Sequence, residues 1–327
     1  MPIPLSAGVI LRERYKVRRV IGQGGMGCIY LADDTLLEGR QCALKEVEID
    51  QSLPEEIRKE ARQQFLREAT VLARLDHPNL PKVSDFFSIE NRDYLVMDYV
   101  PGKDLRTLVQ EAKEENRFIP EESLVDWAHQ LANALMYMHS QQPAILHRDI
   151  KPSNLKVTPD GLVKLVDFGL VKLLAPGEVT VTIMQGQGTA LYTPLEQYGG
   201  DTGHTDVQSD IYSFGATMYH LATNEPPLDA RERFLHPDEF IMPRRINPDL
   251  TQRMERAILW AMSLHPSDRP NSVTEFYQSM VTDRISRPVT SPIQQSNWKF
   301  LSNSVEQGLI AAALGLTVIS LLITLIR

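Results

Sequence analysis

The sequence has few cysteines and no excess of positive charge. Only Cys28 and Cys42 occur in 327 residues, which excludes a disulfide framework and a cysteine-based zinc cluster. The 34 Lys and Arg residues are outnumbered by 42 Asp and Glu residues, giving a formal net charge of -8. This balance argues against a protein held on nucleic acid by phosphate electrostatics, so we expect no nucleic-acid partner.

A secretory signal peptide and internal repeats are also missing. In the first 15 residues the arginines follow the short apolar run, whereas a signal peptide carries its positive charges before it. Apolar residues make up 43% and charged residues 23%, a globular composition that excludes collagen, coiled coil and long-range disorder. At ~150 residues per domain, the length suggests about two domains.

One long apolar run departs from this average composition. Residues 308–326 read GLIAAALGLTVISLLITLI, without a charged side chain, and only Arg327 follows them. As a helix these 19 residues are about 28 Å long, close to the ~30 Å core of a bilayer. A buried core helix is the alternative, but the run lacks the polar face that soluble helices usually keep. We therefore predict a single-pass transmembrane helix at 308–326, joined by a polar linker at 281–307.

The remainder divides into a strand-rich first part and a helix-rich second part. Within 15–90, alternating and β-branched segments predict strands around one helix at 54–75, and an apolar strand follows at 94–100. Further helices are expected at 123–140, 206–223 and 250–264. Strands that come before helices predict two lobes of unlike class.

A glycine cluster lies between two of the expected strands. It reads Gly22-Gln23-Gly24-Gly25-Met26-Gly27, with the G-x-G-x-x-G spacing that lets a backbone approach phosphates. Strand-like residues follow it, which favours a glycine loop inside a hairpin over a dinucleotide-binding turn. Lys45 comes 18 residues after Gly27, in an apolar strand where a charge needs an acidic partner. We expect that partner to be Glu68, with Glu60 as the alternative.

The most specific motif lies in the helix-rich part. It reads His147-Arg148-Asp149-Ile150-Lys151-Pro152-Ser153-Asn154, and Asp167-Phe168-Gly169 begins 13 residues after Asn154. With the glycine loop and Lys45 in the same order, this is nearly the whole signature set of protein kinases. The sequence therefore resembles the eukaryotic-type protein Ser/Thr kinases, and their bacterial branch in particular. Two later segments carry the same resemblance: Ser209-Asp210-Ile211-Tyr212-Ser213-Phe214-Gly215 and His265-Pro266-Ser267-Asp268-Arg269-Pro270.

The resemblance implies a bilobal α+β kinase fold and an organisation of the chain. After a lead-in at 1–14, it implies a kinase domain at 15–280 with a small lobe at 15–97, a hinge at 98–104 and a large lobe at 105–280. The small lobe is expected to be an antiparallel sheet with one main helix, and the large lobe mainly helical.

The resemblance also implies the roles of the site residues. Asp149 accepts the proton of the substrate hydroxyl, Lys151 lies by the γ-phosphate, and Lys45 binds the α- and β-phosphates while Glu68 holds it. Asn154 and Asp167 bind Mg²⁺, with Mn²⁺ as an alternative metal. The ATP site is expected to comprise Ile21, Gly22, Gln23, Gly24, Gly25, Met26, Gly27, Ile29, Ala43, Lys45, Met97, Asp98, Val100 and Asp104.

Two positions depart from the family pattern. The floor of the adenine site is usually aliphatic, but Lys156 stands there, and its methylene groups can cover the base. The activation segment usually ends in Ala/Ser-Pro-Glu, but this chain has Pro194-Leu195-Glu196. The first departure changes the predicted base site, and the second changes the predicted peptide-binding floor.

The activation segment also carries the regulatory expectations. We expect autophosphorylation at Thr180 or Thr182, because an arginine before the catalytic aspartate commonly binds such a phosphate. Thr189 is expected to hydrogen-bond toward the catalytic loop. Structural roles are expected for Glu196 paired with Arg269, and for Asp210.

The sequence thus predicts an ATP-dependent Ser/Thr protein kinase that acts on proteins, itself included, and is anchored in a membrane with its catalytic part in the cytoplasm. The pairs Gly308/Ala312 and Ala311/Gly315 predict weak self-association of the anchor. The alternatives are a pseudokinase scaffold, which should lack Lys45 or one of the catalytic-loop and metal residues, and a small-molecule kinase, which should lack the segment around Glu196.

Overall fold

The computed structural model covers the whole chain and describes residues 3–24, 27–48, 52, 54–167, 172–173, 190–198 and 206–282. All of them belong to the first of two units, Met1–Arg287. The predictions for Gly25, Met26, Thr180, Thr182, Thr189, most of the linker and the span at 308–326 lie outside the described residues. Within the described part, no helix combines the length and the apolar character needed to cross a bilayer.

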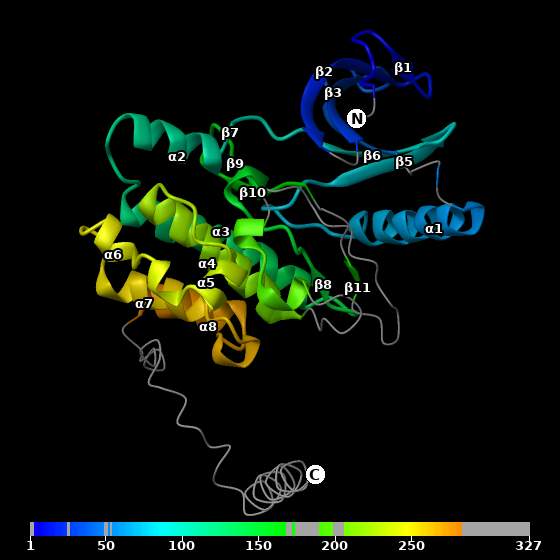
Figure 1. Ribbon diagram of the computed structural model, residues 1–327. Helices are drawn as coiled ribbons and strands as arrows, with labels where there is room; N and C mark the ends of the chain where they lie inside the picture. The colour runs from blue at the N-terminus through cyan, green and yellow to red at the C-terminus, as the bar shows by residue number, and fades with distance from the viewer. Residues whose placement is uncertain are drawn as a thin grey trace, which may run out of the picture. The chain divides into compact units, whose positions relative to one another are not determined.

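A six-stranded antiparallel sheet forms the small lobe, drawn in blue to cyan in Figure 1. The strands run in the order β1, β2, β3, β4, β6, β5. Their bounds are Ile10–Leu11, Tyr15–Gly24, Gly27–Asp34, Gln41–Glu48, Arg92–Asp98 and, for β5, Val83–Ile89. The β2–β3 hairpin contains the glycine loop, and Lys45 lies opposite Ile29 on one side and Leu95 on the other. The predicted strand-rich lobe is thus present.

Helix α1 (Glu55–Leu72) covers one face of this sheet (Figure 1). Its buried residues Phe65, Ala69 and Leu72 join one core with Ala43 and Met97. These helix residues are three and four positions apart, the spacing from which the helix was predicted. The same apolar core continues into the large lobe, so α1 links the sheet to the helical part of the domain.

The N-terminal residues cover the opposite face of the sheet. Leu5 and Val9 pack on a second core around Tyr15, Tyr30 and Tyr94. The Leu5 N–H donates to the Tyr30 hydroxyl at 3.1 Å, and β1 pairs with β2. Residues 1–14 were expected to be a lead-in before the kinase domain; in the structure, Leu5, Val9 and β1 of this segment pack on the small lobe or pair with its sheet. Their role depends on a sheet face formed by distant residues, which local sequence patterns do not reveal.

The large lobe is mainly helical, as predicted. Its helices are α2 (Leu105–Glu114), α3 (Glu121–His139), α4 (Val207–Thr223), α5 (Ala230–Leu235), α6 (Pro243–Ile246), α7 (Gln252–Ala261) and α8 (Val273–Val281). Helices α3, α4 and α7 correspond to the predictions at 123–140, 206–223 and 250–264. The sequence analysis did not predict α2, α5, α6 and α8. For α8 a signal existed, because Ser272 accepts from the Glu275 N–H in a Ser-x-x-Glu capping sequence.

Helix α4 forms the centre of the large lobe. Every residue from Ser209 to Thr223 is buried, which is typical of a helix surrounded by protein on all sides. Gly215 allows close approach of α7, since a Cβ added there would lie 2.7 Å from the Ala261 Cβ. Asp210, in the first turn of this helix, is therefore held rigidly beneath the catalytic loop.

Short strands carry the catalytic loop and its surroundings. Strands β10 (Val163–Leu165), β9 (Leu155–Val157) and β7 (Lys103–Asp104) form one sheet in that order. Strand β8 (Ile145–Leu146) pairs with β11 (Lys172–Leu173). The loop 147–154 lies between β8 and β9 and ends in the short 3-10 helix η1 (Pro152–Asn154).

Candidate active site

Two residues of the catalytic loop contact the carboxylate of a third, Asp149. Asp149 is buried, and the Lys151 ammonium lies 2.9 Å from its carboxylate. The Asn154 Nδ2 donates to the Asp149 carbonyl and to its Oδ2, both at 2.8 Å. These contacts fix the direction of the Asp149 carboxylate and leave a cation directly beside it.

Asp210 holds the start of the same loop. Its carboxylate accepts the His147 N–H at 2.9 Å and the Arg148 N–H at 2.8 Å, and His139 Nε2 lies 2.9 Å away. Burial raises the pKa of Asp210, but His139 and the two backbone N–H groups together lower it by more, so the net shift of the pKa is downward. The ionised carboxylate stabilises a strained turn, since Arg148 has a φ of 64°.

Asp167 brings Lys45 of the small lobe to the catalytic loop. Its carboxylate forms an ion pair with the Lys45 ammonium, and the positive charge of Lys45 lowers the pKa of Asp167. The neighbouring Val166 N–H donates to the Asn154 carbonyl at 2.8 Å, which links the two segments. The structure therefore gathers Lys45, Asp149, Lys151, Asn154 and Asp167 in one site, although 122 positions separate Lys45 from Asp167.

The oxygen atoms at this site suit Mg²⁺. The Nδ2 of Asn154 is engaged by Asp149, so its amide oxygen is the atom that can serve as a metal ligand, together with the Asp167 carboxylate. No group of three or more His, Cys, Asp or Glu residues in the described part of the chain is placed to hold a metal by itself. Mg²⁺ is typically bound by one or two protein oxygens together with substrate phosphates, and these residues fit that pattern.

Glu68 is buried on α1, and the Lys45 ammonium forms an ion pair with Asp167. Glu68 lies close enough to Arg148 to influence its charge. Burial lowers the pKa of Arg148, and the negative charges of Asp210 and Glu68 partly offset this by raising it. The pairing of Lys45 with Glu68 stays a prediction.

The residues predicted for the base site come from adjacent strands. Ala43 on β4 lies directly opposite Met97 on β6, both are buried, and Ile29 on β3 is half-buried. The Asp98 N–H donates to the Lys82 carbonyl at 3.0 Å, which fixes the start of the hinge. Asp104 caps α2, because its Oδ1 accepts the Thr107 N–H at 2.9 Å. This capping role was not foreseen in the sequence.

The predicted pair of Glu196 and Arg269 is present, with Arg269 buried and Glu196 half-buried. Arg269 Nη1 and Nη2 lie 2.7 Å and 3.0 Å from the two carboxylate oxygens of Glu196. Ser209 also donates to Glu196, at 2.8 Å. The pair connects the 3-10 helix η3 (Leu195–Tyr198) to the rest of the large lobe. The shifted proline at Pro194 therefore leaves this connection intact.

A buried histidine beneath this segment predicts acid sensitivity. His220 Nδ1 forms a 2.6 Å hydrogen bond with the Tyr192 hydroxyl, and burial lowers the pKa of His220 to about 4. The unfolded chain binds this proton near pH 6.5, so the free energy of unfolding falls as the pH drops from about 6.5 to about 4, by about 3 kcal/mol. We expect His220→Gln to flatten this part of the stability profile in chemical denaturation. The same change at the exposed His236 should leave the profile unaltered, and equal slopes for wild type and His220→Gln would contradict the assignment.

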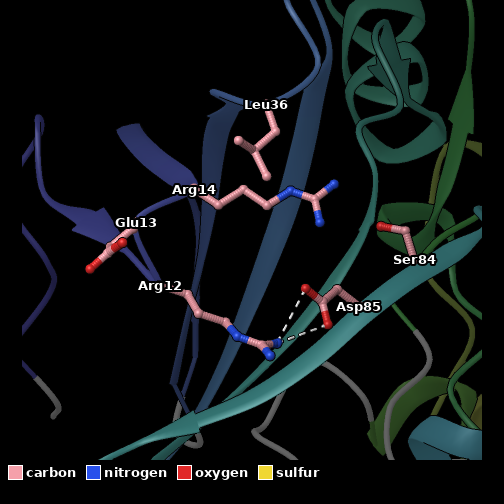
Figure 2. Close-up of a pocket in the computed structure, with 6 residues that line it drawn as sticks. All are labelled: Arg12, Glu13, Arg14, Leu36, Ser84 and Asp85. Atoms are coloured by element: carbon pink, nitrogen blue, oxygen red, sulfur yellow. Dashed lines mark hydrogen bonds and ion pairs between the residues drawn. The ribbon is translucent and has the colours of Figure 1, made fainter.

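A separate hollow lies on the small lobe. It has a volume of about 500 Å³ and is lined by Arg12, Glu13, Arg14, Leu36, Ser84 and Asp85 (Figure 2). Arg12 pairs with Asp85 at 3.2 Å, and Arg14 pairs with Asp34 at 2.7 Å. Both cations are thus balanced by carboxylates, and none of the predicted site residues lines this hollow.

Comparison with known proteins agrees with the site geometry. Residues 15–299 match the family described as the protein kinase domain. The chain belongs to the protein kinase family. A probable serine/threonine-protein kinase of Clostridium acetobutylicum is 35% identical to this kinase domain over 279 residues, which cover 84% of the chain and 40% of the relative. The serine/threonine-protein kinase PrkC of Bacillus subtilis is 32% identical over 80% of the chain and 39% of its own length.

Solved structures show the same fold. The kinase domain of PknI from Mycobacterium tuberculosis matches with a TM-score of 0.64 and 28% identity, over 85% of this chain and 99% of that one. The apo form of PpkA-294 matches with a TM-score of 0.66 and 25% identity, and the match covers 85% of this chain and 99% of that chain. The bilobal protein kinase fold is therefore established for this kinase domain, which spans about two fifths of the length of the curated relatives it matches.

Proposed function

We propose that this chain is an active Ser/Thr protein kinase, which transfers the γ-phosphoryl group of ATP to serine and threonine hydroxyls of proteins, its own included. The observation that carries the proposal is the gathering of Lys45, Asp149, Lys151, Asn154 and Asp167 in one site. Curated relatives with 30–35% identity are named serine/threonine-protein kinases, which supports the choice of hydroxyl substrate.

Each side chain has a part in phosphoryl transfer. The Asp149 carboxylate orients the substrate hydroxyl and accepts its proton, and Lys151 places a positive charge where the γ-phosphate receives that oxygen. Lys45 neutralises the α- and β-phosphates. Mg²⁺, when held by Asn154 and Asp167, neutralises charge on the phosphate oxygens. Since this reaction depends mainly on positioning and charge, the fixed direction of Asp149 is the central requirement.

The competing functions find no support in the chain. A pseudokinase scaffold should lack one of Lys45, Asp149, Asn154 or Asp167, and all four are present. A small-molecule kinase should lack the segment that Glu196 and Arg269 hold in place, and this pair is formed.

The proposed activity is tested with labelled ATP and a generic protein substrate. We expect label on serine and threonine, none on tyrosine, and complete loss of transfer when EDTA removes the divalent metal. Mass spectrometry of the same sample should find phosphate at Thr180 or Thr182. A preparation that labels no protein with Mg²⁺ or Mn²⁺ present would overturn the proposal.

We further propose that residues 308–326 anchor the chain in a membrane, with the kinase domain on the cytoplasmic side, where ATP is available. The apolar run supports this, because a charged residue is absent from all 19 positions. The full chain should sediment with membranes after a high-salt wash, and Leu316→Arg/Ile319→Arg should release it. If the unaltered chain and the double variant stayed with the membranes equally, the proposed anchoring would be contradicted. If the anchor also self-associates, Gly315→Leu should reduce the yield of crosslinked dimer.

A further inference from the structure

Lys156 occupies a place in the nucleotide site where the family pattern expects an aliphatic residue. It lies on β9, directly opposite Asp104 on β7. Side chains of directly opposed residues in a ladder lie on the same face, with their Cβ atoms about 5 Å apart. The family resemblance implies that Asp104 is the residue that meets the ribose of the nucleotide, so the strand register sets Lys156 beside that expected position.

The ammonium group of Lys156 points toward the hinge. Its Nζ lies 5.6 Å from the centre of the Tyr99 ring, and Tyr99 follows Asp98 in the hinge. The side chain is partly buried, and this burial lowers the pKa of Lys156, whereas Asp104 raises it and Arg19 of β2 lowers it. The charge is therefore close to elements of both lobes. The backbone of Lys156 belongs to β9, and the charged end of its side chain lies at the hinge.

Asp104 is already oriented by another contact. Its Oδ1 accepts both the N–H and the hydroxyl of Thr107, at 2.9 Å and 3.1 Å. In the described part of the chain, all hydrogen bonds of this carboxylate go to Oδ1, so Oδ2 is the atom that can accept a hydrogen bond from a ligand. A carboxylate oxygen only accepts hydrogen bonds and a lysine ammonium only donates them. A ribose diol, which does both, matches such a pair.

We propose that Lys156 is a specificity-determining residue of the nucleotide site, whose stem covers the base and whose ammonium donates a hydrogen bond to a ribose hydroxyl oxygen beside Asp104. This inference rests on the proposed kinase function. A buried group that hydrogen-bonds a hydroxyl discriminates against the analogue that lacks it, because the protein group is then left unpaired. The chain should therefore prefer ribonucleosides to deoxynucleosides through Lys156.

The test measures the binding of adenosine, 2′-deoxyadenosine and 3′-deoxyadenosine to the full chain in detergent by titration calorimetry. Lys156→Met keeps the stem and removes the charge. We expect it to weaken adenosine binding by about 5- to 10-fold. For the deoxynucleoside that lacks the contacted oxygen, the loss should be less than about 2-fold. In kinetic measurements on Lys156→Met, the KM for ATP should rise with little change in kcat. Lys156→Arg keeps a positive charge and should retain the preference for adenosine over the deoxynucleosides.

Lys103→Met is the matched control. Lys103 lies on the same sheet next to Asp104, but its exposed ammonium pairs with Glu111 at 2.6 Å. This variant should bind all three nucleosides like the wild type. Equal losses for all three nucleosides in Lys156→Met, no loss, or tighter binding would each overturn the inference while leaving the kinase proposal intact. Failure of the unaltered chain to bind adenosine would overturn both the role of Lys156 and the proposed kinase function.

Discussion

Replacing Asp149 with asparagine is expected to slow phosphoryl transfer by about 10²- to 10⁴-fold, the range for removal of a general base. Asparagine has the same size and can still accept hydrogen bonds from Lys151 and Asn154, so the loop geometry should survive. An amide cannot take the proton of the substrate hydroxyl. The loss should therefore appear in kcat, and the KM for ATP should change by less than about 3-fold.

The measurement is the initial rate of label transfer from ATP at saturating Mg²⁺, with nucleotide affinity measured separately. Asp160→Asn provides a control of the same chemistry, since Asp160 is fully exposed in the turn between β9 and β10. That variant should retain the wild-type rate. If Asp149→Asn labelled protein as fast as wild type, the assignment of the base and the proposed mechanism would both be wrong.

Arg269→Ala is expected to destabilise the kinase domain by about 3–5 kcal/mol, the cost of breaking an ion pair whose arginine is buried. The Arg269 side chain is fully buried and binds both oxygens of Glu196. It also donates to three main-chain carbonyls, those of Ser263, Gln208 and Leu264, at 2.8–2.9 Å. Removal leaves Glu196 and these carbonyls without their strongest donor.

Thermal unfolding measures this effect, and a loss of this size should lower the midpoint by about 10 °C for a domain of this length. Arg117→Ala serves as the control, because its ion pair with Glu115 is exposed on both sides and such pairs contribute about 0–1 kcal/mol. A Glu196→Ala/Arg269→Ala double variant should be less destabilised than the sum of the two single variants. Additive losses would contradict a direct coupling of the two side chains.

The short motifs were enough to predict which residues gather at the candidate site. Asp149, Lys151 and Asn154 are close in sequence, so the tight loop that carries them also brings them together. The helices α1, α3, α4 and α7 followed from apolar spacing, because each has a face that must be buried. Glu196 and Arg269 were paired through the family resemblance alone, since nothing local connects residues 73 positions apart.

The amino-acid sequence by itself determined the family, the two unlike lobes and the residues that form the candidate site, because these depend on residue type and local spacing. Only the tertiary structure decided that residues 3–14 cover the sheet, that Lys45 meets Asp167, and that Lys156 lies between Asp104 and Tyr99. These contacts join segments that are distant in the chain. Their geometry depends on how sheets and helices pack, and a pattern of neighbouring residues carries no information about that packing.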